Sequence, residues 1–215
     1  MAVKQQLDIP AVPNLGTSGI SYSQEVQNQN NNSLRTFFIK LVNSLQSITS
    51  RMGGKYINFP YGAFQSVADQ TIATANTAIA ITMDTTDFSN GVTLSNSSRI
   101  NVANAGIYNL QWSGQFQNTD SQLHDVSVWL KKNGTDVVGS TGFISVPNSH
   151  GGVDGHSIVG WNYFLELAEN DYIQIYWSST STTISLQFYP TQTSPTRPST
   201  ASVIATMTFV SKILD

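Results

Sequence analysis

The stretch Ile100-Asn-Val-Ala-Asn-Ala-Gly106-Ile-Tyr-Asn-Leu-Gln-Trp112 decides the fold class of this chain. From Tyr108 to Trp112 every second residue is apolar, and the residues between them are polar. Successive side chains of a β-strand point to opposite faces, so this alternation predicts a strand with one buried and one polar face. Gly106 stands directly before the strand, where the missing side chain permits a close approach of another segment.

The same alternation extends through the rest of the C-terminal three quarters of the chain. It recurs in residues 126–130, 161–167, 173–177, 184–188 and 203–210. Turn residues separate these runs, at Asn90-Gly91, Ala105-Gly106, Asn133-Gly134 and Asn170-Asp171. Repeated short strands without a second helix predict an antiparallel sandwich or barrel, which we place at residues 55–215.

A short amphipathic helix is predicted for residues 33–54, before the β region. Ser33 is its expected N-cap, and Gly53-Gly54 its expected C-terminal stop. Its apolar residues are spaced alternately four and three apart, as in a heptad seam, and they are Leu34, Phe38, Leu41, Leu45, Ile48 and Met52. The seam predicts either self-association of the helix in a trimer or packing against its own domain or another protein.

Residues 1–32 form a polar segment that is predicted to be an extended anchoring arm. It ends in the run Gln27-Asn-Gln-Asn-Asn-Asn32 and contains prolines and glycines earlier. Such a composition does not bury enough apolar surface to offset the loss of chain entropy on folding.

The composition favours a protein that works within an assembly. Charged residues make up 11% of the chain and apolar residues 40%, so neutral polar residues fill much of the surface. The net charge of -3 argues against a nucleic-acid partner, which requires a clustered basic face. No run is long and apolar enough for a membrane span, and no secretory signal is recognisable, so synthesis in the cytoplasm is expected. The absence of cysteine excludes disulfides and thiolate chemistry.

Four pieces of the β region resemble the C1q/TNF-like jelly roll, in the order of that family. They are the segments Ile100–Trp112, Val126-Ser-Val-Trp-Leu-Lys-Lys-Asn-Gly134, Phe164-Leu-Glu-Leu-Ala-Glu-Asn-Asp-Tyr-Ile-Gln-Ile175 and the closing strand Ala201–Phe209. The chain departs from the family pattern at Ile100 and Leu110, where the family has aromatic residues, and at Asn170, where it has glycine. The resemblance implies an all-β, antiparallel jelly-roll sandwich of ten strands, a tight homotrimer, and a binding role instead of a catalytic one.

A second resemblance concerns the segment Gly53-Gly-Lys-Tyr-Ile-Asn-Phe-Pro-Tyr-Gly-Ala-Phe64 behind a polar arm and a helix. This arrangement resembles structural proteins of tailed marine bacteriophages. It implies a virion location as a head decoration, a fibre or a tail component.

Candidate chemical sites are sparse. His150, Asp154 and His156 have the side-chain types of metal ligands, but three or four convergent ligands are needed, and no metal site and no cofactor are predicted. Most acidic residues stand beside turn signals, where aspartate usually caps the backbone, so no catalytic residue is predicted; these acids are Asp84, Asp87, Asp120, Asp136, Glu169 and Asp171. A jelly-roll hydrolase or metalloenzyme remains a third hypothesis that depends on the histidine loop.

The four tryptophans divide by strand parity. Trp112, Trp161 and Trp177 share a face with the apolar residues of their strands and are predicted in the core. Trp129 faces the other way, which suits a subunit interface or a ligand platform such as a sugar site.

These patterns together predict a non-enzymatic, homotrimeric bacteriophage structural protein on the virion surface. Residues 1–52 are expected to attach it to capsid, portal or tail proteins. The alternative is a carbohydrate- or receptor-binding tip for attachment to a host surface glycan or receptor.

Overall fold

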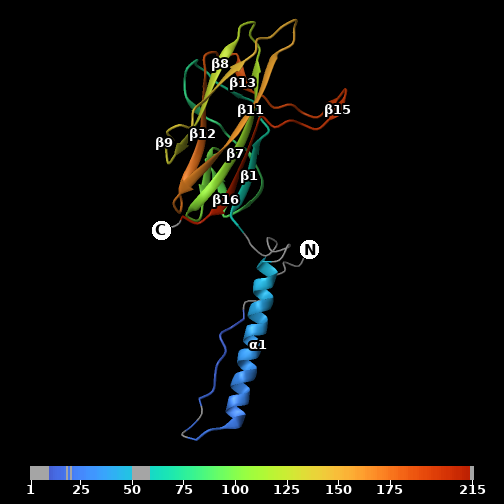
Figure 1. The fold of residues 1–215 in the computed structure, drawn as a ribbon. Coiled ribbons are helices and arrows are strands. Elements are labelled where there is room, and N and C mark those ends of the chain that lie inside the picture. The colour runs from blue at the N-terminus through green and yellow to red at the C-terminus, as the bar shows by residue number, and fades with distance from the viewer. Residues whose placement is uncertain (1–9, 18, 20, 50–58, 214–215) are drawn as a thin grey trace. The chain divides into compact units, whose positions relative to one another are not determined.

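The computed structural model describes residues 10–17, 19, 21–49 and 59–213 (Figure 1). The chain divides into two units, Met1–Asn58 and Phe59–Asp215. The first unit holds one helix, and the second consists mostly of antiparallel β-sheet. No helix in the described ranges is both long and apolar enough to cross a membrane.

The helix α1 spans Gln24–Thr49 and therefore begins earlier than predicted. Ser23, and not Ser33, is at its start: the Ser23 hydroxyl accepts from the backbone N–H of Val26 at 3.4 Å, and the Ser23 carbonyl accepts from that of Gln27 at 3.1 Å. The polar run at residues 27–32, predicted as part of an extended arm, is helical. The predicted stop at Gly53-Gly54 lies outside the described residues.

The described part of the arm is attached to α1 by a reciprocal pair of hydrogen bonds. The side-chain oxygen of Asn30 accepts from the backbone N–H of Gly16 at 2.9 Å, and its amide nitrogen donates to the Gly16 carbonyl at 2.8 Å. An asparagine amide can therefore satisfy both backbone groups of an extended residue. The helix places the Asn30 side chain where it can hold the arm.

The second unit is an antiparallel β sandwich of two large sheets (Figure 1). Sheet A contains β2 (Gln70–Thr71), β13 (Ile184–Leu186), β7 (Gly106–Asn118), β16 (Val203–Ser211), β1 (Tyr61–Ser66) and β4 (Thr85–Asn90), with β11 (Gly155–Leu167) on the other edge of β7. Sheet B contains β10 (Gly142–Val146), β8 (His124–Lys132), β12 (Tyr172–Ser179), β6 (Arg99–Val102) and β5 (Val92–Ser95), with β3 (Ile79–Ala80) on β12 and β9 (Thr135–Asp136) on β8. A separate hairpin of β14 (Gln192–Thr193) and β15 (Thr196–Arg197) projects from the sandwich (Figure 1).

The principal strands pair in a nested order. β1 pairs with β16, β6 with β12, β7 with β11, and β8 with β10, all antiparallel. The first and last strands of this set are neighbours, as are the second and second-last, and so on to the innermost pair. Strands far apart in the sequence, such as β1 and β16, therefore lie side by side in sheet A.

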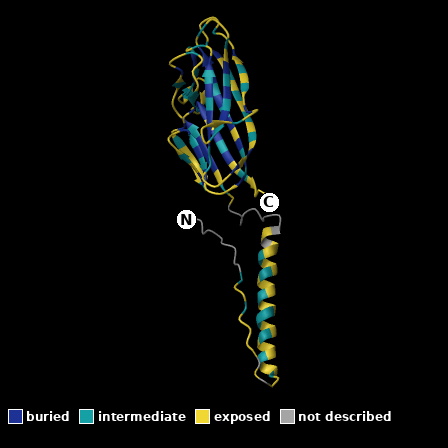
Figure 2. Cartoon of the chain, turned by 90° about the vertical axis from the view of Figure 1, so that its left-hand side faces the viewer, coloured by how far each residue is buried: buried dark blue, intermediate teal, exposed yellow. Residues whose placement is uncertain are grey.

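The core lies between the two sheets, where the inner faces of their strands meet (Figure 2). Trp112 and Trp177 are buried, as their parity predicts, and Trp161 is half-buried and packs against the same core. Tyr108 is fully buried and donates through its hydroxyl to the Asn104 carbonyl at 2.8 Å. Gly106 is required because a Cβ there would collide with the ring of Phe209, which confirms the expected close approach.

The predicted turns at Asn133-Gly134 and Asn170 are confirmed by the backbone. Asn133 and Gly134 have φ angles of 51° and 83°, and they join β8 to β9. Asn170, which stands where the resembling family has glycine, has a φ of 66°. Asparagine tolerates this left-handed region better than other residues with a side chain, so the departure from the family pattern preserves the corner.

Candidate functional site

The outer face of sheet A, formed by β7, β11 and β16, carries no charged side chain between its ends. Its residues are Asn109, Gln111 and Ser113 on β7, Gly160, Asn162 and Phe164 on β11, and Ile204, Thr206 and Thr208 on β16. Glu166, which pairs with Ile107, lies beyond one end of this set, and Ile158, which pairs with Gln115, lies beyond the other. We call this set the uncharged face. Phe164 is 63% exposed and Ile204 45%, although both are large and apolar.

A shallow depression lies at the middle of the uncharged face. Its outward-facing wall includes Gln111, Ser113, Asn162 and Thr206, and Gly160 lies between them. A Cβ at Gly160 would lie 2.6 Å from the carbonyl oxygen of Trp112, so only glycine fits there. The depression therefore follows from the packing of the sheet at Gly160. Its lining side chains are uncharged, like those of the rest of the face.

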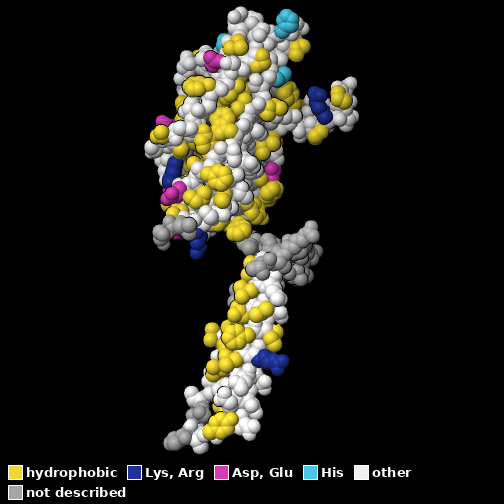
Figure 3. All heavy atoms as spheres, in the orientation of Figure 1, with side chains coloured by type: hydrophobic (Ala, Val, Ile, Leu, Met, Phe, Trp, Pro, Cys, Tyr) yellow, Lys and Arg dark blue, Asp and Glu magenta, His cyan; other side chains and the backbone are white. Residues whose placement is uncertain are grey.

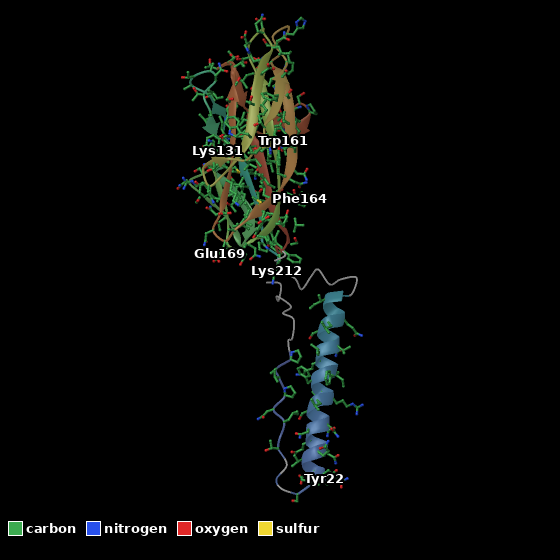
Figure 4. The ribbon with its side chains drawn as sticks, turned by 60° about the vertical axis from the view of Figure 1, so that its left-hand side comes forward. Tyr22, Lys131, Trp161, Phe164, Glu169 and Lys212 are labelled. Atoms are coloured by element: carbon green, nitrogen blue, oxygen red, sulfur yellow. The ribbon has the colours of Figure 1, made fainter. Side chains whose placement is uncertain are left out.

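The outer face of sheet B differs because its charged groups are partnered within the chain. Lys131 lies 3.2 Å from Asp136 and 4.8 Å from the ring centre of Tyr176. Arg99 lies over the ring of Tyr172 at 4.5 Å. The opposite placement of Lys131 and Phe164 on the sandwich is visible in Figure 4. This charged face suits contact with water, although Phe143 is 80% exposed on its edge strand β10.

Trp129 lies on the outer face of sheet B, as its parity predicts. Its indole N–H donates to the carboxylate of Asp136 at 2.8 Å, and its ring lies 6.0 Å from that of Tyr176. These contacts fix the ring in a half-buried position on the charged face. Neither an interface nor a ligand role of Trp129 is tested by this geometry, and both remain predictions.

The predicted seam forms an apolar stripe on α1 that is largely exposed in the single chain. Phe38 is 55% exposed, Leu45 51% and Ile48 36%, while Leu34 and Leu41 are half-buried. Met52 lies outside the described residues. Ile39 and Val42 widen the exposed stripe, and Figure 3 shows hydrophobic side chains gathered along one side of the helix.

The histidine loop does not assemble a metal site within the described residues, where no group of three or more potential ligand side chains is found. His156 contacts the ring of Tyr189, and the Asp154 carboxylate accepts a short hydrogen bond from Gln117. The backbone of His150 forms a bridge with Val153. The side chains of His156 and Asp154 therefore have separate local partners.

The prediction that the acidic residues serve turns is confirmed for Asp171, which accepts from the Ala168 N–H at 2.8 Å, whereas Asp87 and Asp136 lie in the strands β4 and β9. Asp84 accepts from the backbone N–H of Val67 at 3.1 and 3.2 Å. His124 donates to Asp120 at 2.7 Å, and this bond lowers the pKa of that carboxyl below its usual value. Burial would raise the pKa of Asp171, but hydrogen bonds from Asn133, Lys132 and the Ala168 N–H outweigh it, and the pKa is lowered.

Comparison with known proteins adds no relative to these observations. No protein-family model matches the chain, and no curated protein sequence matches it.

Sequence reasoning identified the seam but missed the uncharged face. The available signal was Phe164 of β11 and Ile204 of β16, which are apolar residues at the outward parity of their strands. In an isolated strand such residues indicate only that both faces carry apolar groups. Whether such residues form a continuous surface depends on the pairing of three strands that are distant in the sequence.

Proposed function

We propose that this chain is a non-enzymatic, homotrimeric structural protein of a virion surface, with residues 1–52 as its anchor and the β sandwich as its displayed knob. The uncharged outer face of β7, β11 and β16 is the observation that carries the proposal. Cores of protein interfaces are depleted in charge, whereas solvent-facing surfaces need it for solubility. The copies associate through this face.

The strand pairing supports a jelly roll of the C1q/TNF type for the knob. A jelly roll forms when one long antiparallel hairpin rolls up, so that its pairs are nested from the ends inward. The pairs β1–β16, β6–β12, β7–β11 and β8–β10 have this nesting. β4 beside β1 and β5 beside β6 bring the set to the ten strands that the resemblance implies.

The exposed stripe of α1 supports association of the N-terminal units. Apolar residues that repeat every three and four positions pack into a partner helix as knobs into holes. Phe38 and Leu45 are more than half exposed in the single chain, so the free energy of burying them is still available to a partner. Three copies joined at the knob bring three such helices together, which raises their local concentration.

The virion location is supported by the resemblance of residues 53–64 and by a surface poor in charge. Its test is electron microscopy of viral particles from cells that make this chain, labelled with an antibody against the β sandwich. We expect label on the particle surface and loss of label when residues 1–52 are deleted. Recovery of the full chain only in the particle-free fraction would contradict the proposal.

A further inference from the structure

A concave site lies at the end of sheet A opposite to the segment where the chain enters the sandwich. Phe59 stacks on Phe209 at 5.8 Å, and Phe209 contacts Tyr108 at the start of β7. Gln115 lies seven residues further along the same strand. At the rise of an extended strand this separation is about 23 Å. The site is therefore remote from the entry of the chain.

Residues from distant parts of the sequence line this concavity, which we call the distal site. They include Gln115, His156, Ile158, Gln187, Tyr189, Arg197 and Thr200. Arg197 comes from the projecting hairpin of β14 and β15. Backbone hydrogen bonds of 3.1 and 2.8 Å between Tyr189 and Thr200 close the base of this hairpin beside the site.

An aromatic corner forms one wall of the distal site. The rings of His156 and Tyr189 are 6.0 Å apart and inclined by 71° to each other. Phe116 also borders the site, but its ring is buried and packs against Trp177 in the core. Two inclined rings present apolar surface to a ligand while their polar atoms remain at the edge, a combination typical of small-molecule sites.

Several hydrogen-bonding groups around the corner have no partner within the described part of the chain. These are the Gln115 side-chain amide, the His156 ring nitrogens and the Arg197 guanidinium. The amide of Gln187 is held in place, since it donates to the Phe188 carbonyl and accepts from the Ser185 hydroxyl, both at 3.2 Å. Planar amides and a guanidinium next to aromatic rings match a ligand with an apolar face and adjacent hydroxyl groups.

The charges near the distal site argue against an anionic ligand. Arg197 contributes one positive charge, but Asp69 and Asp154 lie close enough that, after burial, their charges raise the pKa of Tyr189. Asp69 accepts from the Phe188 N–H at 2.8 Å, and Asp154 accepts from Gln117, so both carboxylates are fixed there. The surroundings of the arginine therefore favour a neutral ligand.

We infer that the distal site binds a neutral saccharide, with the pyranose ring against Tyr189 and His156 and its hydroxyls bonded to Gln115 and Arg197. This adds a recognition role to the proposed structural role. It does not depend on the number of copies in the assembly, because all the named side chains come from one chain.

The test is saturation-transfer NMR on the full chain with methyl glycosides of glucose, galactose, mannose and N-acetylglucosamine, and with glucuronic acid as an anionic probe. We expect transfer to at least one neutral glycoside. Tyr189→Ala should weaken its binding about tenfold, as expected for loss of an aromatic contact. Phe143→Ala, which removes an exposed aromatic side chain from β10 of the opposite sheet, is the matched control and should leave binding unchanged.

Arg197→Ala should also weaken binding, and circular dichroism checks that each variant is folded. If Tyr189→Ala does not fold, Gln115→Ala replaces it, because that change removes only a half-exposed amide. Three results would overturn the inference: no transfer to any neutral glycoside, binding of glucuronic acid alone, or loss of binding in Phe143→Ala with retention in Tyr189→Ala. Sedimentation of the same samples reports the number of copies separately, so failure of this inference is distinguishable from failure of the proposed trimer.

Discussion

The substitution Thr206→Glu tests whether the uncharged face is buried between copies. Thr206 is half-buried in β16, pairs with Gln111 of β7 and borders the central depression. The depression has no cation in its wall, so a new carboxylate would find no ionic partner in its own chain. In a single exposed sandwich, such a change at a polar surface position would cost little.

Burial between copies changes this expectation because the carboxylate must lose its water. An unpaired charge within an interface costs about 3–5 kcal/mol. Each 1.4 kcal/mol corresponds to a tenfold change in the dissociation constant, so each contact weakens by about two to three and a half powers of ten. Every copy in a trimer carries the substitution, and the penalty is therefore repeated at each contact.

The assay is sedimentation velocity of wild type and variant over a range of concentrations, and Ser127→Glu is the matched control. Ser127 is half-buried in β8, a central strand of the opposite sheet. We expect Thr206→Glu to sediment as a folded single chain and Ser127→Glu to remain associated like the wild type. The reasoning is refuted if Thr206→Glu stays fully associated or if both substitutions dissociate the protein equally.

Three further predictions concern the helix, a turn and an ion pair. Phe38→Ser together with Leu45→Ser should lower the thermal midpoint of helix melting, followed by circular dichroism, because it removes the exposed stripe; an unchanged midpoint would mean that these residues contact no partner. Gly134→Val should lower the free energy of unfolding in urea by about 1–3 kcal/mol, because Gly134 has a φ of 83°. Because the pKa of Asp171 is lowered in the fold, its contribution to stability is present at neutral pH and is lost as the pH falls through the folded-state pKa. Unfolding titrations of Asp171→Asn should therefore show a weaker loss of stability below about pH 4 than wild type, and an equal loss would contradict the role of Lys132 as its partner.

The β architecture was predictable wherever local pattern and burial agree. Trp112 and Trp177 are in the core because alternation in a strand reports directly which face is buried. Asn133 and Gly134 form the expected turn because only a few residues tolerate two successive positive φ angles. In both cases the signal lies within a few residues of the structure that it predicts.

The helix begins at Gln24, and not after Ser33 as predicted, because the composition of residues 27–32 is a weaker indicator of structure than the helix cap that precedes them. The Gln/Asn run at residues 27–32 resembles a disordered segment, whereas Ser23 followed by an acidic first turn at Glu25 is a helix start. Within the helical run, Asn30 bonds the arm at Gly16. That contact joins residues 14 positions apart and has no local sequence signal.

The distal site was not predictable for a similar reason. Tyr189 and Arg197 lie between the predicted strands at residues 184–188 and 203–210, and Gln115 and His156 belong to two separate strands. The pairing of β7 with β11 brings the last two together, and the hairpin after β13 adds the first two. The spacing of these four residues in the sequence therefore does not reveal that they meet in the fold.

The most direct test of the central claim is the mass of the full chain in solution by multi-angle light scattering at micromolar concentration. The account predicts a particle of three copies of the 23.4 kDa chain. A stable particle with the mass of one chain over the same concentration range would contradict it.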